Sequence, residues 1–156
     1  MADANFPDSF QAGAVILTHE LPAQAELVSL YASVQWTSYT RDPGTLERAV
    51  RQSSFVVCAR SDDGELLGLA RAVSDDVSVC YVQDVLVRPE AHRQGVGRSL
   101  MRAVLTRYAH VMQQVPLTDD GEAQQAFYRS LGLHNTRDLT RNVTNCFYRD
   151  TRSDLS

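Results

Sequence analysis

The stretch from Gln83 to Leu100 constrains the fold more than any other part of the sequence. A run of β-branched and apolar residues ends at Pro89, and Gly95 and Gly97 then precede a segment with helical apolar spacing. This pattern predicts a strand, a turn and a helix that begins beside the glycines. The first N–H groups of a helix lack internal partners and lie at the positive end of its dipole. The turn therefore predicts an anion site suited to a pyrophosphate.

Charge supports this interpretation, because Arg88, Arg93, Arg98 and Arg102 gather at the turn of a chain whose net charge is -4. Two common phosphate-binding motifs are excluded. No Gly-Lys-Ser/Thr follows the glycines, so the turn is not a Walker loop, and the third glycine of a dinucleotide-binding fingerprint is missing.

The rest of the chain predicts an α/β fold with a mixed sheet. Strands are expected at 14–18, 55–59, 65–73, 77–87 and 115–117, then around Leu133 and at 142–148; helices are expected at 22–34, from Asp42 onward, and at 95–112 and 122–131. Turn signals at 61–64 and 74–76 make the first strands an antiparallel meander. The strand–helix–strand segment 77–117 makes its two strands parallel, with a right-handed connection.

Length and composition narrow the class of protein. The 156 residues suit one domain, 1–156, with flexible ends at 1–11 and 150–156. The acidic balance favours neither nucleic acid nor membrane as a partner, and no apolar run approaches the roughly 20 residues that span a bilayer. The first eleven residues lack the features of a secretory signal, so we expect a cytoplasmic protein. Cys58, Cys80 and Cys146 are widely spaced, which predicts neither a disulfide framework nor a metal site.

Two motifs resemble those of the GNAT superfamily of N-acetyltransferases. The segment His92-Arg93-Gln94-Gly95-Val96-Gly97 is similar to its motif Q/R-x-x-G-x-G/A, with His92 as a departure at the first position. The segment 126–133, Ala-Phe-Tyr-Arg-Ser-Leu-Gly-Leu, is similar to the family's A-x-F-Y-x-x-L-G-F ending. The likeness extends from about Ala14 to Tyr148 and implies the GNAT fold, whose parallel strands splay apart.

The resemblance implies acetyl-CoA as the cosubstrate and assigns residues to it. The backbone of Val85 and Val87 would pair with the pantetheine arm, and an N–H near Val85 would face the thioester carbonyl as an oxyanion donor. The pyrophosphate would lie on the amides of the turn, that is on Arg93, Gln94, Gly95, Val96, Gly97 and Arg98. Direct transfer, typical of the family, needs no cysteine nucleophile.

Acetyl transfer to an amine needs a base, because an alkylammonium has a pKa of about 10.4, and an acid for the departing thiolate. The resemblance assigns the acid to Tyr128. Asp84 is the candidate base, since a carboxylate that interrupts an apolar strand lines a cleft or is paired; a salt-bridged role is the alternative. Asp120, with its neighbour Asp119, is a candidate for binding a cationic amine, or else caps the next helix.

The acceptor region is expected around Tyr31, Trp36 and Tyr39, whose aromatic character suits an aryl or apolar amine, although core packing explains such residues too. Residues 68–75 and 84–87 also look like plant-type arylalkylamine (serotonin) N-acetyltransferases and their bacterial relatives. The leading hypothesis is therefore an enzyme acting on a small-molecule amine. Alternatives are a protein N-terminal or lysine acetyltransferase, which predicts an open groove, and a non-catalytic acyl-CoA-binding regulatory module. Homodimers are common in the family, but no interface is evident in the sequence.

Overall fold

The computed structural model describes residues 9–12 and 15–152. They form two compact units, one ending at Leu117 and the other beginning at Thr118. A single domain over residues 1–156 stays a prediction. Of the ends expected to be flexible, residues 9–11 belong to a strand, and residues 1–8 and 153–156 lie outside the described residues, so their flexibility stays a prediction.

The first unit is built on one mixed sheet of six strands in the order β1-β2-β3-β4-β5-β6. Strands β1 to β5 pair antiparallel, and β5 pairs with β6 in parallel. The strands are β1 (Ser9–Ala12), β2 (Val15–Thr18), β3 (Phe55–Arg60), β4 (Leu66–Ser74), β5 (Val79–Val87) and β6 (Gln113–Pro116). This topology confirms the predicted meander and parallel crossover. Strand β1 was missed because its pairing with β2, rather than any apolar pattern of its own, defines it.

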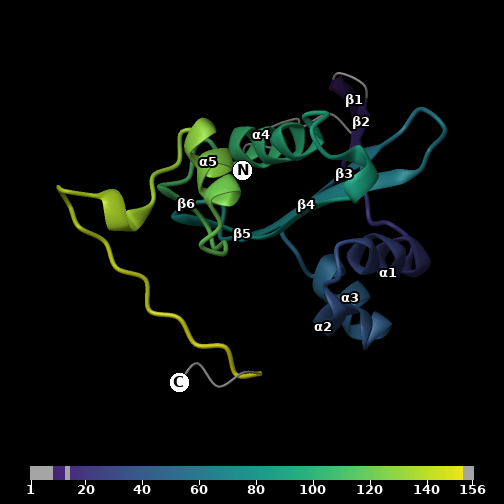
Figure 1. Ribbon diagram of the computed structural model, residues 1–156, viewed down its shortest axis with the longest axis horizontal. Coiled ribbons are helices and arrows are strands. Elements are labelled where there is room, and N and C mark those ends of the chain that lie inside the picture. The colour runs from purple at the N-terminus through teal and green to yellow at the C-terminus, as the bar shows by residue number, and fades with distance from the viewer. Residues whose placement is uncertain (1–8, 13–14, 153–156) are drawn as a thin grey trace. The chain divides into compact units, whose positions relative to one another are not determined.

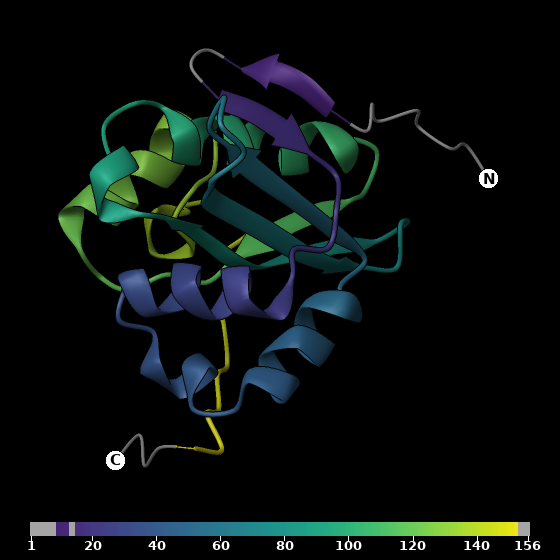
Figure 2. The same cartoon turned by 90° about the vertical axis from the view of Figure 1, so that its right-hand side faces the viewer.

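Helices cover both faces of this sheet (Figures 1 and 2). On one face lie α1 (Gln24–Ser33), α2 (Thr37–Thr40) and α3 (Pro43–Arg51); on the other lies α4 (Val96–Arg107). Because both faces are covered, the first five residues of β3 are all buried, without the alternation of a half-exposed strand. The core on the α1 side contains Leu27, Leu30, Leu46 and Leu69, and Leu100, Met101 and Val104 of α4 are buried on the other.

Local sequence explains where the helices begin and end. Asp42 precedes Pro43 and caps α3, with its carboxylate accepting a hydrogen bond from the Thr45 amide at 3.0 Å. Helix α4 stops at Arg107, although its apolar spacing predicts a continuation to residue 112. The side-chain amide of Gln114 accompanies the early end, because its Nε2 donates to the carbonyls of Leu105 and Tyr108 at the helix terminus.

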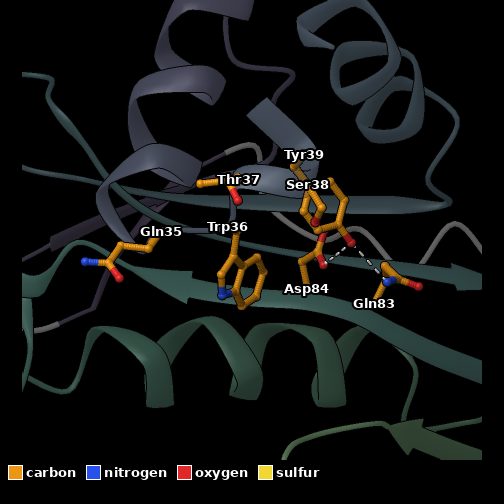
Figure 3. Close-up of a pocket in the computed structure, with 7 residues that line it drawn as sticks. All are labelled: Gln35, Trp36, Thr37, Ser38, Tyr39, Gln83 and Asp84. Carbon is orange, nitrogen blue, oxygen red and sulfur yellow. Dashed lines mark hydrogen bonds between the residues drawn. The ribbon is translucent and has the colours of Figure 1, made fainter. Parts of the chain in front are cut away.

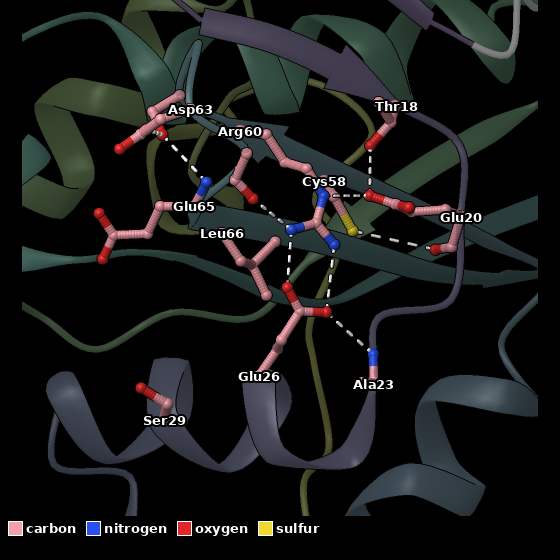
Figure 4. Close-up of polar contacts among 12 residues, drawn as sticks. Thr18, Glu20, Ala23, Glu26, Ser29, Cys58, Arg60, Asp63, Glu65 and Leu66 are labelled. Atoms are coloured by element: carbon pink, nitrogen blue, oxygen red, sulfur yellow. Dashed lines mark hydrogen bonds and ion pairs between the residues drawn. The ribbon is translucent and has the colours of Figure 1, made fainter.

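An ion-pair cluster anchors the start of α1 to the sheet (Figure 4). Arg60, at the end of β3, donates to Glu20 at 2.5 Å and to Glu26 at 2.7 Å, and also to the carbonyl of Gly64 at 2.8 Å. Glu26 in turn accepts from the Ala23 amide at 3.0 Å. One guanidinium thus joins the first turn of α1 to the β3–β4 turn, and so fixes the helix whose far end faces the candidate site.

The second unit contains α5 (Glu122–Ser130) and a short 3₁₀ turn at Thr136–Asp138. The strands predicted around Leu133 and at 142–148 do not form in the described residues, which corrects that prediction. A strand needs a partner for its backbone groups, and residues 118–152 contain no other strand to supply one. Throughout the described ranges, no helix has both the length and the apolar character needed to cross a bilayer.

Candidate active site

Strand β5 carries the candidate site because its two halves are paired differently. Its first half, Val79 to Val82, pairs with Gln113 to Pro116 of β6. Its second half, from Gln83 to Val87, has no partner strand on that side within the described residues. Pro116, which has no N–H, stands where the pairing ends. The two parallel strands therefore separate and leave an open edge on β5.

The hydrogen-bond pattern shows which backbone groups face this edge. The Arg88 amide donates to the Leu67 carbonyl at 2.8 Å, and hydrogen-bonded pairs recur at every second residue of an antiparallel ladder. Leu86 and Asp84 therefore bond to β4, whereas the backbone of Val85 and Val87 points away from it. The Val87 carbonyl is 2.9 Å from Nε2 of His92. The N–H and C=O of Val85 and the N–H of Val87 remain directed at the open edge.

The turn after β5 forms an anion-binding shape. Gly95 has a φ of +79°, which favours glycine, and occupies the N-cap position of α4. The first bond within the helix runs from the Ser99 amide to the Gly95 carbonyl at 2.9 Å. No side chain caps this helix in the described structure. The amides from Gly95 to Arg98 thus precede the helical hydrogen bonds, as a phosphate cradle requires.

One basic side chain near this turn bonds to other elements. Arg88 turns toward β4 and α1, where it donates to the Leu66 carbonyl at 2.8 Å and to Ser29 Oγ at 2.9 Å. We expected Arg88 to add positive charge to the turn, and this expectation is corrected: its guanidinium bonds to β4 and α1 instead. His92, the departure from the motif, links the turn to the end of β5 through Val87, while Arg93 is exposed.

A pocket lies beside Asp84, between β5 and residues 35–39, which include most of α2 (Figure 3). Its volume is about 410 Å³, within the range of small-molecule sites. Gln83 is the extra residue of a β-bulge, since Asp84 pairs with Arg71 and Val82 with Ala72. Bulges turn side chains in new directions, and Gln83 here borders the pocket. The lining residues are Gln35, Trp36, Thr37, Ser38, Tyr39, Gln83 and Asp84.

The carboxylate of Asp84 is the centre of a buried polar cluster. It accepts hydrogen bonds from the hydroxyl of Tyr31 at 2.8 Å and from that of Tyr39 at 3.0 Å. It also pairs with Nε of Arg71 at 2.5 Å. Asp84 is 3% exposed and Arg71 is 6% exposed, so both charges are nearly removed from water and compensate each other. Asp84 therefore forms the salt bridge that was expected as the alternative to a role as base, and it also borders the pocket.

The three aromatic residues expected around the acceptor occupy different positions. Trp36 and Tyr39 line the pocket, with ring centroids 6.0 Å apart and planes inclined by 30°. Tyr31 has 0% exposure, is not among the residues that line this pocket, and donates a hydrogen bond to Asp84. Burial, and next the charge of Asp84, raise the pKa of both Tyr31 and Tyr39, which keeps both phenols protonated.

The remaining predicted site residues belong to the second unit. Tyr128 lies on α5, with its ring 5.1 Å from that of Phe127. Burial and the nearby Asp119 carboxylate raise the pKa of Tyr128, which favours the protonated form that an acid needs. Asp120 accepts from Arg137 at 3.1 Å. The alternative role of the aspartate pair as a helix cap is wrong, because the N-cap of α5 is Gly121.

Arg71 is a residue of the site that sequence reasoning missed. It interrupts the apolar strand β4 in the same way that Asp84 interrupts β5. Two opposite charges in neighbouring buried strands are a signal for a pair, since an uncompensated charge would be expensive at either position. Among the described residues, no cluster of three or more potential metal ligands occurs.

A strand with an open edge, a helix N-terminus at its end and a pocket beside it form a site suited to a cosubstrate that carries amide and phosphate groups. The acetyltransferase (GNAT) family model matches residues 21–133. The chain belongs to the GNAT family and is an N-acetyltransferase of the EC 2.3.1 class. The family uses acetyl-CoA as its cosubstrate.

Individual relatives agree with this family. A chloroplastic GCN5-related N-acetyltransferase 2 of Arabidopsis thaliana is 35% identical over 99 residues, covering 57% of this chain but only 37% of that protein. The peptidyl-lysine N-acetyltransferase YiaC of Escherichia coli (strain K12) is 29% identical over 121 residues, covering 74% of this chain and 77% of YiaC. A solved GNAT acetyltransferase from Streptococcus pneumoniae TIGR4 superposes with a TM-score of 0.73 and 28% identity, covering 88% of this chain and 98% of that one.

Proposed function

We propose that this protein transfers an acetyl group from acetyl-CoA directly to the primary amine of a small molecule, with arylalkylamines as the favoured acceptor class. The observation that carries this proposal is the arrangement along β5. Val85 faces an open edge with its backbone, and the preceding residue, Asp84, borders a pocket lined by aromatic and polar side chains.

The donor side fits acetyl-CoA by its backbone groups. The free groups of Val85 and Val87 suit the amides of a pantetheine arm, and the amides between Arg93 and Arg98 suit a pyrophosphate. Acetyl-CoA supplies the acetyl group as a reactive thioester. The Val85 N–H is the proposed donor to its carbonyl oxygen.

The proposed catalytic residues are Asp84 and Tyr128. Asp84 receives the proton that the acceptor ammonium must lose before its nitrogen can attack. Tyr128, which the family motif assigns, donates a proton to the departing sulfur. Trp36 and Tyr39 contact the body of the acceptor, with Tyr31 behind them, and Asp120 is a further candidate for binding its charge.

A protein lysine side chain is the second candidate acceptor, because YiaC is named as a peptidyl-lysine N-acetyltransferase. The lining of the pocket favours the small molecule. Trp36 and Tyr39 offer ring surface to the flat apolar group of an arylalkylamine, a group that a lysine side chain lacks.

Calorimetry with acetyl-CoA tests the donor side. We expect micromolar binding, about -8 kcal/mol, by the wild-type protein. Gly97→Glu places a negative charge in the first turn of α4 and should abolish binding. Thr106→Glu adds the same charge to the exposed last turn of the same helix and is the matched control, with binding expected to be retained. If the wild-type protein does not bind acetyl-CoA at millimolar concentration, the proposal is contradicted.

Turnover tests the acceptor side. We expect faster acetylation of 2-phenylethylamine and tryptamine than of a lysine-containing peptide, measured by release of free CoA thiol. Tyr128→Phe should lower kcat about 100-fold while acetyl-CoA binding stays unchanged. Preferential acetylation of the peptide would shift the assignment to the second candidate. Binding without turnover of any amine would favour a non-catalytic acyl-CoA-binding module.

A further inference from the structure

The two oxygens of the Asp84 carboxylate have different surroundings. Oδ2 accepts from Tyr31 at 2.8 Å and from Arg71 at 2.5 Å, which uses both of its lone pairs. Oδ1 accepts from Tyr39 at 3.0 Å and has one lone pair left. Any new proton on this carboxylate is therefore expected at Oδ1, the oxygen bonded to Tyr39.

The hydroxyl of Tyr39 connects this oxygen to the pocket. Tyr39 lines the pocket, and its oxygen both donates to Asp84 and accepts from Nε2 of Gln83 at 3.2 Å (Figure 3). A phenol oxygen has one proton and two lone pairs, so one acceptor position remains. An ammonium group in the pocket can donate a hydrogen bond to that position.

On the basis of the proposed function, we propose that Tyr39 is a catalytic residue that carries the proton of the acceptor ammonium to Asp84. One N–H bond of the ammonium breaks as an O–H bond forms at Tyr39 Oη. At the same time the original O–H bond of Tyr39 breaks and a new one forms at Asp84 Oδ1. The ammonium becomes a neutral amine with a free electron pair, Asp84 becomes a neutral acid, and Tyr39 ends as the phenol it was.

The surroundings of Tyr39 suit a relay rather than ionisation. Burial, followed by the charge of Asp84, raises the pKa of Tyr39, so its hydroxyl keeps a proton to pass on. The other titratable or charged groups facing it are Tyr31 from α1 and Arg71 from β4, the latter 6.0 Å from the Tyr39 ring centroid. The ionised side chains of α3, which also packs on α2, bond elsewhere: Glu47 to Gln24 and Arg51, and Arg48 to Thr45.

Arg71 and Tyr31 act as positioning residues in this arrangement. Both bond to Oδ2 and so fix the plane of the carboxylate with Oδ1 toward Tyr39. Arg71 is itself held by Ser53 Oγ at 3.3 Å and by the Ala49 carbonyl at 3.4 Å. The carboxylate therefore has little freedom to turn away from the relay.

The test compares Tyr39→Phe with Tyr31→Phe, each of which removes one hydroxyl from Asp84 and keeps the ring. The readout is kcat/KM for 2-phenylethylamine, or for the best amine of the turnover panel, from about pH 7 to about pH 10. Tyr39→Phe should lower kcat/KM about 100-fold at pH 7. The loss should shrink as pH approaches the pKa of the amine, because an amine that is already neutral needs no relay. Tyr31→Phe should cause a smaller loss that does not change with pH.

Two results would overturn the relay: wild-type kcat/KM in Tyr39→Phe at pH 7, or an equal loss at every pH. Acetyl-CoA calorimetry and a thermal melt of each variant show whether a loss comes from unfolding. A wild-type protein that binds no acetyl-CoA and acetylates no amine would instead refute the proposed function itself, so the two failures are distinguishable.

Discussion

At Asp84, the backbone of strand β5 pairs with β4 and the side chain bonds to three partners, whereas one residue later the backbone faces an open edge. The proposed acceptor side consists of side chains that bond to one another: Asp84 bonds to Arg71, Tyr31 and Tyr39. The proposed donor side consists of backbone groups, those of Val85 on the half of β5 that pairs with no further strand in the described residues and the amides at the start of α4 that precede its helical hydrogen bonds. A closed cluster of side chains can fix a proton path in one geometry. Free backbone amides can bind a long flexible cosubstrate without depending on particular side chains.

The largest expected effect comes from breaking the closed cluster. Asp84→Asn removes the charge that compensates Arg71, whose side chain is only 7% exposed. Loss of one partner of a buried pair should lower the free energy of unfolding by about 3–5 kcal/mol, measured by urea denaturation. Asp76→Asn is the control, because Asp76 pairs with Arg107 at the surface and its loss should change stability by about 1 kcal/mol or less. Similar losses in the two variants would contradict the account of the cluster.

A smaller effect is expected from crowding the donor side. A Cβ added to Gly68 would lie 2.8 Å from the Leu86 carbonyl oxygen and 3.1 Å from Leu100 of α4. Gly68→Ala should therefore lower the free energy of unfolding by about 1–3 kcal/mol and weaken acetyl-CoA binding. Gly44→Ala is the matched control in α3, where the new Cβ meets its nearest neighbour at 3.6 Å. It should be neutral or stabilise the protein by up to about 1 kcal/mol. Wild-type stability in Gly68→Ala would show that β4 tolerates the added methyl and would contradict the expected crowding.

The smallest expected effect on stability comes from the ion-pair cluster of Arg60, Glu20 and Glu26 at the start of α1, and it depends on pH. The hydrogen bond from Arg60 lowers the pKa of Glu26 below its usual 4.5. A lowered folded-state pKa contributes stability above the unfolded pKa, and this stability is lost as pH falls through the folded value. Glu26→Gln should thus reduce stability at pH 7 and flatten its decline below about pH 4.5. Glu65→Gln is the control, because its contact with Arg88 is 3.7 Å long, and it should reduce stability at pH 7 by less than Glu26→Gln does. If the free energy of unfolding of Glu26→Gln depends on pH as that of the wild type does, the stabilising role of the Glu26–Arg60 pair is contradicted.

The contrast between the two sides also explains what the sequence could predict. The strand, turn and helix around Gly95 are local, so their spacing predicts the cradle, whereas the backbone role of Val85 is what the family resemblance implies. The cluster around Asp84 joins residues 13 to 53 positions apart, and no local pattern indicates that Tyr31 and Tyr39 meet one carboxylate. Arg71 was missed for the same reason. The fold was predictable where strands alternate with turns. The strand expected at 142–148 does not form, because residues 118–152 contain no partner strand.

The most direct test of the account is an amide titration with acetyl-CoA by NMR. We expect the amide signals of Val85, Val87 and Gly97 to shift and their hydrogen exchange to slow, because the cosubstrate occupies their free N–H groups. The amide of Leu86, already bonded to β4, should show little change in exchange. Binding that leaves Val85 and Gly97 unaffected would contradict the assignment of the open edge and the turn to acetyl-CoA.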